Sequence, residues 1–341
     1  MAANRLNFRV EKPDTATATP VLEADSTPIN PSRSTSYCIF QEAWWLDAVA
    51  PGQWRDVTVS SGGVLRARWP IFEERRALFH AITLPPVTHR LGPWLDLGDA
   101  TKSSRRYEVE KDLTVALLEQ LPAYDMLQIN CHSAITNTLP FVWAGFDAMA
   151  RYTYVVDLTQ TEEALWAGLR ENIRRETRKG RKQLRIETIE DVGECIRLIG
   201  KSYARQGNPN AFDSPAMYRL NDACAQRGRR EMLVARDEQG AIHAAIYLVW
   251  DDRTTYYLAG GADPELRTSG AHSLLIWEAL RRSKARSLEF DMTGSMVESI
   301  ERFFRAFGGQ QRVYFSLNGM SRRARVAWHG KKMFEALFHR A

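Results

Sequence analysis

Residues 231–263 constrain the fold more than any other part of the chain. They consist of three apolar runs, EMLVARD, AIHAAIYLVW and TTYYLAGGAD, separated by short polar turns at Glu238-Gln239-Gly240 and Asp251-Asp252. Runs rich in Val, Ile, Leu and Tyr between tight turns are typical of consecutive antiparallel strands. Helical and strand-like patterns alternate on either side of this meander, so the sequence predicts an α/β protein with a mixed sheet.

The elements around the meander extend this pattern to most of the chain. The second half predicts strands at YTYVVDL, LRIETI, SLEFDM and RVYFSL, with helices at 161–180, DVGECIRLIGKSYARQ, SPAMYRLNDACAQR, TSGAHSLLIWEALRRSKAR and ESIERFFRAFG. The first half predicts a short helix at YCIFQEAWWLDAVAP with Phe40, Trp44, Leu46 and Val49 on one face, strands at DVTVSS, GVLRARWPIF and MLQIN, and a helix over 104–120.

The chain is long enough for two domains, because it has 341 residues of which 44% are hydrophobic. Residues 1–36 are rich in Thr, Ala, Pro and Ser and short of large apolar side chains, which predicts a disordered tail. We expect one α/β domain over 37–150, a second over 151–318, and a basic amphipathic helix over 319–341.

Charge and composition exclude few functions. The net charge of +5 allows anionic partners such as CoA or tRNA but requires none. Four scattered cysteines without a C-x-x-C pair indicate reduced thiols in a cytoplasmic protein, and the histidines lack metal-ligand spacing. No apolar run reaches the roughly 20 residues of a membrane span, and the N-terminus lacks the plan of a signal peptide.

The stretch 168–187 holds eight Lys or Arg against three Glu. Leu165, Leu169, Ile173 and Thr177 recur at four-residue spacing, so we expect one helix that Gly180 ends, with its charge facing solvent. A non-catalytic RNA-binding or scaffold protein is an alternative for such a basic surface. The chain lacks the stacked aromatics and basic groove of RNA modules, which disfavours that reading.

Several segments resemble those of a known family. RYTYVVDL, RENIRRETRKG, YYLAGGAD and FDMTGSMVESIERFFRAFGG resemble segments of GNAT N-acyltransferases, and their tandem arrangement resembles the FemAB-like proteins. PPVTHRLGPW and NTLPFVWAGF resemble the bacterial branch of BioF2-like acyltransferases. The resemblance implies two tandem GNAT-like domains and transfer of an acyl or aminoacyl group to an amine.

This resemblance implies an N-acyltransferase that uses acyl-CoA, or a carrier-bound acyl group, and no metal. The acceptor would be an amine of a small molecule or of a cell-envelope precursor, and no DNA partner is expected. Aminoacyl-tRNA-dependent transfer, as in peptidoglycan bridge formation, is the alternative. It is disfavoured because Phe304 stands where tRNA-dependent relatives commonly have Lys.

The resemblance also implies a donor site at the start of a helix, where backbone N–H groups hold a diphosphate. The matching residues are Arg267, Ser269, Gly270 and Ala271, followed by His272 where the family pattern has a small residue. The bulk of His272 would crowd a phosphate, and an ordinary helix cap at Thr268 or Ser269 is the alternative. Arg305 would supply charge in place of the missing Lys.

Three residues are candidates for proton transfer. Asp291 follows a predicted strand and could accept the amine's proton, although an Asp before Thr293-Gly294 is equally typical of a turn. Tyr257 or its neighbour Tyr256 would face the cleft, since side chains alternate along a strand. His243 is a second candidate base, against the commoner role of a lone histidine in a core.

Substrate contacts are expected from both domains. Trp94, in a Gly-Pro-Trp turn, would present an aromatic surface from the first domain, and Phe304 would line the second. Tyr218 matches a cell-wall enzyme pattern, but Ser214 replaces its nucleotide-binding Arg, which puts a UDP-linked acceptor in doubt. We expect the C-terminal helix to pack on the domain, with peripheral contact to an anionic membrane as the alternative.

Overall fold

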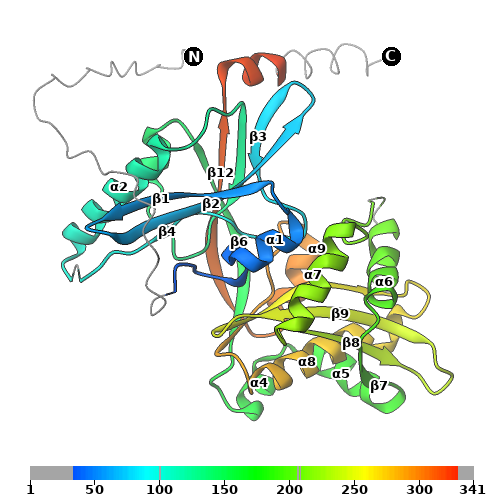
Figure 1. The fold of residues 1–341 in the computed structure, drawn as a ribbon. Helices are drawn as coiled ribbons and strands as arrows, with labels where there is room; N and C mark the ends of the chain where they lie inside the picture. Colours follow the sequence, from blue (N-terminus) through cyan, green and yellow to red (C-terminus); the bar gives the residue numbers. More distant parts are fainter. Residues whose placement is uncertain (1–33, 100, 206, 208, 329–341) are drawn as a thin grey trace, which may run out of the picture.

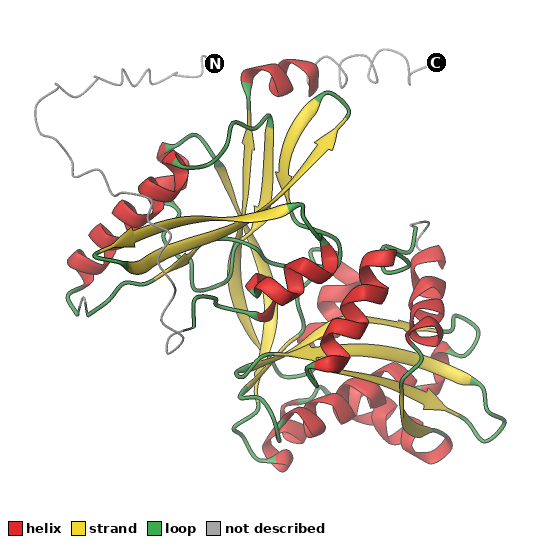
Figure 2. Cartoon of the chain, in the orientation of Figure 1, coloured by secondary structure: helices red, strands yellow, loops and turns green. Residues whose placement is uncertain are grey.

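The computed structural model describes residues 34–99, 101–205, 207 and 209–328 (Figure 1). Within these residues one 12-stranded sheet runs through both halves of the chain, with helices packed on its faces (Figure 2). The predicted tail over 1–36 lies almost entirely outside the described residues. Of the predicted helix over 319–341, residues 319–320 instead end the last described strand, residues 322–328 are helical, and residues 329–341 lie outside the described residues.

The predicted elements of the first half occur in the predicted order, and four further elements lie among them: a 3-10 helix, two strands and a short helix. Together these are η1 Ile39–Gln41, α1 Ala43–Val49, β1 Trp54–Ser61, β2 Val64–Arg76, β3 Phe79–Thr83, β4 Trp94–Leu95, α2 Ser103–Glu119, β5 Met126–Asn130 and α3 Leu139–Trp143. The hairpin of β1 and β2 around Ser-Gly-Gly is confirmed by its antiparallel register.

The second half is the longer one. Its elements are β6 Asp147–Asp157, α4 Glu162–Gly168, α5 Glu171–Gln183, β7 Arg185–Ile189, α6 Val192–Arg205, α7 Pro215–Gln226, β8 Arg230–Arg236, β9 Ile242–Trp250, β10 Thr254–Ala262, η2 Arg267–Ser269, α8 Ala271–Ser283, β11 Glu289–Asp291, α9 Glu298–Arg305 and β12 Gln310–Met320. The predicted meander is confirmed, because β8, β9 and β10 pair antiparallel in sequence order. The mixed sheet is also confirmed, since β10 pairs parallel with β11 and β3 parallel with β5.

Two long strands, β6 and β12, join the halves through the middle of the molecule (Figure 1). The first part of β12 pairs with β6, and its last five residues pair with β5 of the first half. The other end of β6 pairs with β11 of the second half. The last strand of the chain thus completes the sheet of the first half, and a domain boundary at 150/151 would fall inside β6.

The N-terminal helix α1 belongs to the core of the second half. Phe40 and Trp45 are fully buried in one cluster with residues of α6, α7, β9 and β10. Arg219 of α7 donates to the carbonyl of Ala48 at 2.8 Å. The predicted Trp44 packs against the edge of this core, where the guanidinium of Arg227 lies 4.8 Å from the centroid of its ring, and Trp45 is also buried.

The predicted helix over 161–180 is wrong in two respects, because it is divided and it continues further. The chain breaks at Leu169, whose ψ of 139° is extended, and the N–H of Arg170 donates to the carbonyl of Ala306 at 2.9 Å. The two chain segments lie close together at Gly168 and Gly308, and this hydrogen bond between them replaces the helical one that is lost at the break. The four predicted core residues nevertheless remain buried, namely Leu165, Leu169, Ile173 and Thr177.

Gly180 does not end α5, as predicted, but lies inside it where α5 crosses α8. A Cβ at Gly180 would lie 3.1 Å from a methyl group of Leu274. Gly270, at the start of α8, has φ +79°, and a Cβ there would lie 2.2 Å from the carbonyl oxygen of Glu176. The two glycines therefore set how closely these helices approach.

Gly270→Ala should destabilise the protein far more than an alanine at an open left-handed glycine. Gly228 is the matched control, because its φ is +60° and nothing lies within 4 Å of a built Cβ. We expect a cost of about 1 kcal/mol for Gly228→Ala from backbone strain alone, and at least about 3 kcal/mol for Gly270→Ala. Equilibrium unfolding in urea measures both, and equal costs would contradict the close helix contact.

Candidate functional site

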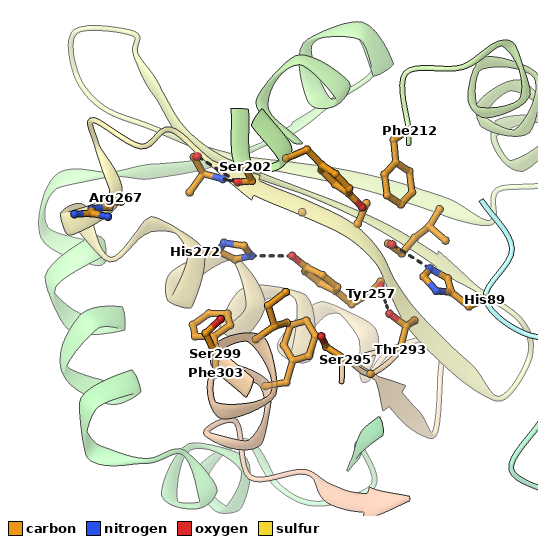
Figure 3. A pocket seen from close by; sticks show the side chains of 18 of the residues that line it. His89, Ser202, Phe212, Tyr257, Arg267, His272, Thr293, Ser295, Ser299 and Phe303 are labelled. Atoms are coloured by element: carbon orange, nitrogen blue, oxygen red, sulfur yellow. Dashed lines mark hydrogen bonds between the residues drawn. The ribbon is translucent and has the colours of Figure 1, made fainter. Parts of the chain in front are cut away.

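A cavity opens where β10 and β11 diverge. The two strands pair over only three residues each, Thr254–Tyr256 with Glu289–Asp291, while β10 continues to Ala262. The cavity has a volume of about 540 Å³ and lies along the unpaired edge of β10 (Figure 3). It extends from Arg267 near the start of α8 to His89, which comes from the first half of the chain. No Asp or Glu is among the described residues that line it.

Tyr257 and His272 form a hydrogen-bonded pair on one wall of this cavity (Figure 3). The hydroxyl of Tyr257 lies 2.8 Å from Nε2 of His272, and the two rings are stacked with centroids 6.1 Å apart. Gly260 makes room for this pair, since a Cβ there would lie 1.9 Å from the Tyr257 hydroxyl. Position 260 therefore requires glycine, because the Tyr257 side chain occupies the space that a Cβ would need.

Both members of the pair are neutral at pH 7. Burial lowers the pKa of His272 from its usual 6.5 to about 4, so its imidazole is uncharged. Burial also raises the pKa of Tyr257 above its usual value, which keeps the phenol protonated. One proton therefore lies between the phenolic oxygen and Nε2, and either atom can carry it.

The turn after β11 forms another wall of the cavity. Thr293 has a left-handed backbone with φ +57°, and its hydroxyl donates to the carbonyl of Tyr257 at 2.9 Å. Gly294 has φ +82° and packs against the carbonyl of Tyr152. Because Gly294 has no side chain, it lines the cavity with its backbone. Within the described part of the chain, no group accepts a hydrogen bond from the N–H of Gly294 or Ser295.

A buried ion pair holds this turn in place. Arg90, from the first half, donates to Oδ2 of Asp291 at 2.6 Å. Oδ1 of Asp291 accepts from the hydroxyl of Thr153 and, at 2.7 Å, from the N–H of Thr293. Burial would raise the pKa of Asp291, but the charge of Arg90 and these hydrogen bonds outweigh it and lower that pKa.

Comparison with known proteins agrees with this geometry. Residues 167–306 match the family model described as an acetyltransferase (GNAT) domain. We call this part of the chain, with the cavity that it lines, the GNAT domain. No curated protein matches it in sequence.

Solved structures extend the similarity to most of the chain. The crystal structure of FemX is 11% identical, with 82% of this chain and 91% of that chain covered and a TM-score of 0.59. A tandem GNAT protein from the clavulanic acid biosynthesis pathway is 12% identical, with 87% and 91% covered and a TM-score of 0.50. A conserved protein of unknown function from Bacteroides thetaiotaomicron VPI-5482 is 11% identical, with 82% and 88% covered and a TM-score of 0.50. The predicted resemblance to FemAB-like, tandem GNAT proteins is thus confirmed for the fold, which is that of GNAT acyltransferases.

Three of the predicted site residues meet in the cavity of the GNAT domain. Tyr257 lines it, Arg267 lies at one end, and Phe304 places its ring 5.5 Å from that of Tyr257. Asp291 is not among the lining residues, and both of its carboxylate oxygens already accept hydrogen bonds from Arg90, Thr153 and Thr293. The geometry therefore favours a structural role for Asp291 over the predicted role as base.

The other donor-site candidates of the GNAT domain are buried beside the cavity. Gly270 faces α5, and the carbonyl of Ser269 accepts from Gln183 at 3.0 Å. Ala271 is buried, and the hydroxyl of Ser269 has no hydrogen-bond partner among the described residues. Only Arg267 of this predicted set lines the cavity.

Four predicted residues lie elsewhere. His243 bonds to Asp237 at 2.9 Å, and Arg305 pairs with Glu301 at 3.0 Å on the surface of α9. Trp94 is buried on β4, and Tyr218 is exposed on α7. Neither of these aromatic residues lines the cavity. The described residues contain no cluster of three or more His, Cys, Asp or Glu that could hold a metal ion, and none of their helices is both long and apolar enough to cross a bilayer.

Sequence reasoning missed two histidines of the GNAT cavity. His272 was expected only to crowd a phosphate. A histidine where the family pattern has a small residue was nevertheless a signal that this side chain has a role. His89, whose ring lies 3.3 Å from the carbonyl of Leu258, gave no such signal. Its contribution depends on how the first half packs against β10, which no local pattern reveals.

Asp291→Asn should destabilise the protein by about 3–5 kcal/mol, because it leaves the charge of Arg90 buried without a partner. Replacing both residues, as Arg90→Met with Asp291→Leu, should cost clearly less than the two single changes added together. Urea unfolding of the four proteins measures this coupling. Arg302→Met with Glu298→Leu, an exposed pair on α9, is the control and should show little coupling. If the losses in unfolding free energy at Arg90 and Asp291 were simply additive, they would contradict an energetic coupling between the two buried residues.

Stability should fall as the pH is lowered from 7 to 5. Burial lowers the pKa values of His89, His132 and His272 to about 4, while unfolded histidines titrate near 6.5. Between pH 7 and 5 these histidines therefore bind protons in the unfolded chain but not in the folded one. The free energy of unfolding consequently decreases as the pH falls. Urea unfolding at several pH values tests this, and His272→Gln should reduce the slope by up to one proton. A slope unchanged by His272→Gln would contradict a neutral, buried His272.

Proposed function

We propose that the protein is an N-acyltransferase that takes an acyl group from acyl-CoA and transfers it to an amine of a small molecule or a cell-envelope precursor. The observation that carries this proposal is the Tyr257–His272 pair in a cavity between diverging strands, beside two backbone N–H groups from which no described residue accepts a hydrogen bond. These are the groups that acyl transfer to nitrogen requires: a path for a proton and donors for an oxyanion.

The donor would lie along the unpaired edge of β10. An extended chain with amide groups, such as pantetheine, can pair with a free strand edge. Its diphosphate would face Arg267 and the first N–H groups of α8, where the helix dipole favours negative charge. Gly270 serves helix packing in this proposal rather than direct phosphate contact, and Arg305 makes no contact with the donor.

The proton would move through the pair as the amine attacks. The amine nitrogen bonds to the acyl carbon and passes a proton to the phenolic oxygen of Tyr257, whose own proton moves to Nε2 of His272. With a pKa of about 4, the imidazolium returns the proton readily, by the same route, to the leaving thiolate. The carbon–sulfur bond breaks, and the products are an amide and free CoA.

The oxyanion would be held by the turn after β11. The N–H groups of Gly294 and Ser295 belong to a turn that hydrogen bonds of Thr293 hold in place, so they would cost little reorganisation during the reaction. Since none of the described residues that line the cavity carries a carboxylate, the acceptor would bind as a neutral amine rather than as an ion-paired ammonium group. This fits the need for an unprotonated nucleophile.

Aminoacyl-tRNA is a second candidate donor, favoured by one observation. The exposed basic residues Arg175, Arg178 and Lys182 lie on α5, and Lys179 of the same helix donates to the carbonyl of Thr268 beside Arg267. A basic surface therefore borders the donor end of the cavity. It suits either the nucleotide part of CoA or the phosphates of a tRNA end. Against tRNA, Phe304 occupies the place of the expected Lys.

We further propose that the chain acts in the cytoplasm and forms two GNAT-like units, close to 37–150 and 151–318, which share the strands β6 and β12. The four cysteines are all buried as free thiols, in keeping with a reducing compartment. His89 of the first unit lines the cavity of the second, so the catalytic cavity would need both units.

Tyr257→Phe and His272→Gln should each lower kcat/KM by about 10²–10⁴-fold while the protein stays folded. Release of free thiol from a panel of acyl-CoA donors with amine acceptors measures the rate, and the melting temperature reports folding. Tyr152→Phe, at a half-exposed tyrosine on β6, is the matched control and should keep wild-type activity. Wild-type values of kcat/KM in both cavity variants would contradict the proposed proton path.

A further inference from the structure

One end of the molecule combines exposed apolar and unpaired basic side chains. The tip of the β2–β3 hairpin and the helix over 322–328 meet there, at the top of Figure 1. Arg323 donates to the carbonyl of Leu78 at 3.2 Å, and its guanidinium lies 5.5 Å from the ring centroid of Phe79. Leu78 is 86% exposed and Val326 is 73% exposed. These are the two most exposed large apolar side chains of the described residues.

Charge at this end is positive. Arg75 on the hairpin and Arg322 and Arg325 on the helix are exposed, and none of them forms an ion pair with a described residue. The neighbouring Arg76 and Arg323 are already neutralised, by Glu74 and Asp125 respectively. We call Arg75, Leu78, Arg322, Arg325 and Val326 the basic tip.

Hydrogen bonds and an ion pair of Asp125 hold the two parts of the basic tip together. Asp125 accepts hydrogen bonds from the N–H of His80 at 3.0 Å and from the hydroxyl of Ser321 at 3.0 Å, and it also pairs with Arg323. It thus fastens the start of the helix to the hairpin. Ala324 is buried, whereas Val326 faces away from the protein. The described part of the C-terminal helix therefore contacts the domain through Ala324 and leaves Val326 exposed.

The chain beyond this helix continues the same composition. Residues 329–341 contain three basic residues and one acidic residue together with four large apolar ones, namely Lys331, Lys332, Arg340, Glu335, Met333, Phe334, Leu337 and Phe338. A basic sequence with interspersed large apolar side chains is typical of segments that lie at a lipid surface.

We propose that the basic tip docks on the surface of an anionic phospholipid bilayer. The three arginines would contact the lipid headgroups, while Leu78 and Val326 would enter the boundary of the acyl chains. Aliphatic side chains offer no platform for base stacking, which favours lipid over RNA. Like charges would repel a second copy of the same surface. The inference does not rest on the proposed transferase activity.

Co-sedimentation of the full chain with lipid vesicles tests this surface. We expect binding to vesicles that mix phosphatidylcholine with phosphatidylglycerol, weakened by salt, and little binding to phosphatidylcholine alone. Arg322→Gln and Arg325→Gln should each weaken binding about fivefold, as expected for one arginine at an anionic surface. Leu78→Ser should weaken it as well without changing the salt dependence.

A matched charge change elsewhere serves as the control. Lys182→Gln with Arg185→Gln removes two exposed charges from α5 and β7 and should leave vesicle binding unchanged. Equal binding to both kinds of vesicle, no binding, or tip variants that bind like the wild type would each overturn the proposal. Binding of a single-stranded RNA homopolymer that the tip variants abolish, without vesicle binding, would overturn it in favour of RNA. Circular dichroism confirms that these surface variants stay folded.

Discussion

The buried carboxylate of Asp291 connects three parts of the structure through hydrogen bonds. It accepts hydrogen bonds from Arg90 of the first half, from Thr153 of β6 and from the backbone of Thr293. Through Thr293, whose hydroxyl holds the carbonyl of Tyr257, it fixes the turn against β10. A buried charge pair adds little stability by itself, but it tolerates few alternative arrangements. We infer that it defines the shape of the cavity.

The order of the helices and strands could be predicted because local sequence patterns determine most of them. Alternating apolar residues gave the β8–β9–β10 meander, and helical periodicity gave α6, α7 and α8. The path of β12 could not be predicted, because pairing with β5 depends on strands nearly 200 residues away in sequence. The same holds for the break at Leu169, since the hydrogen bond that replaces the helical one comes from Ala306. Tertiary contacts decided both features.

The candidate site was predictable only in part, and it was obscure where the two halves meet. Tyr257, predicted from strand alternation, lines the cavity, as do Arg267 and Phe304, which the resemblance implied. Asp291 was read as a base because the sequence gives no sign of Arg90, 201 residues earlier, as its partner. His272 looked like a defect in a phosphate loop until Tyr257 was seen beside it. A departure from a family pattern can therefore mark a function as well as a loss.

A crystal structure with a non-hydrolysable acyl-CoA analogue would test the central claim most directly. If the cavity performs acyl transfer, the acyl carbonyl will lie within hydrogen-bond distance of the N–H groups of Gly294 and Ser295. The sulfur position will then face the hydroxyl of Tyr257, and the diphosphate will lie near Arg267. An analogue that binds outside the cavity, or one that fails to bind while Tyr257 and His272 stay paired, would contradict the proposed mechanism.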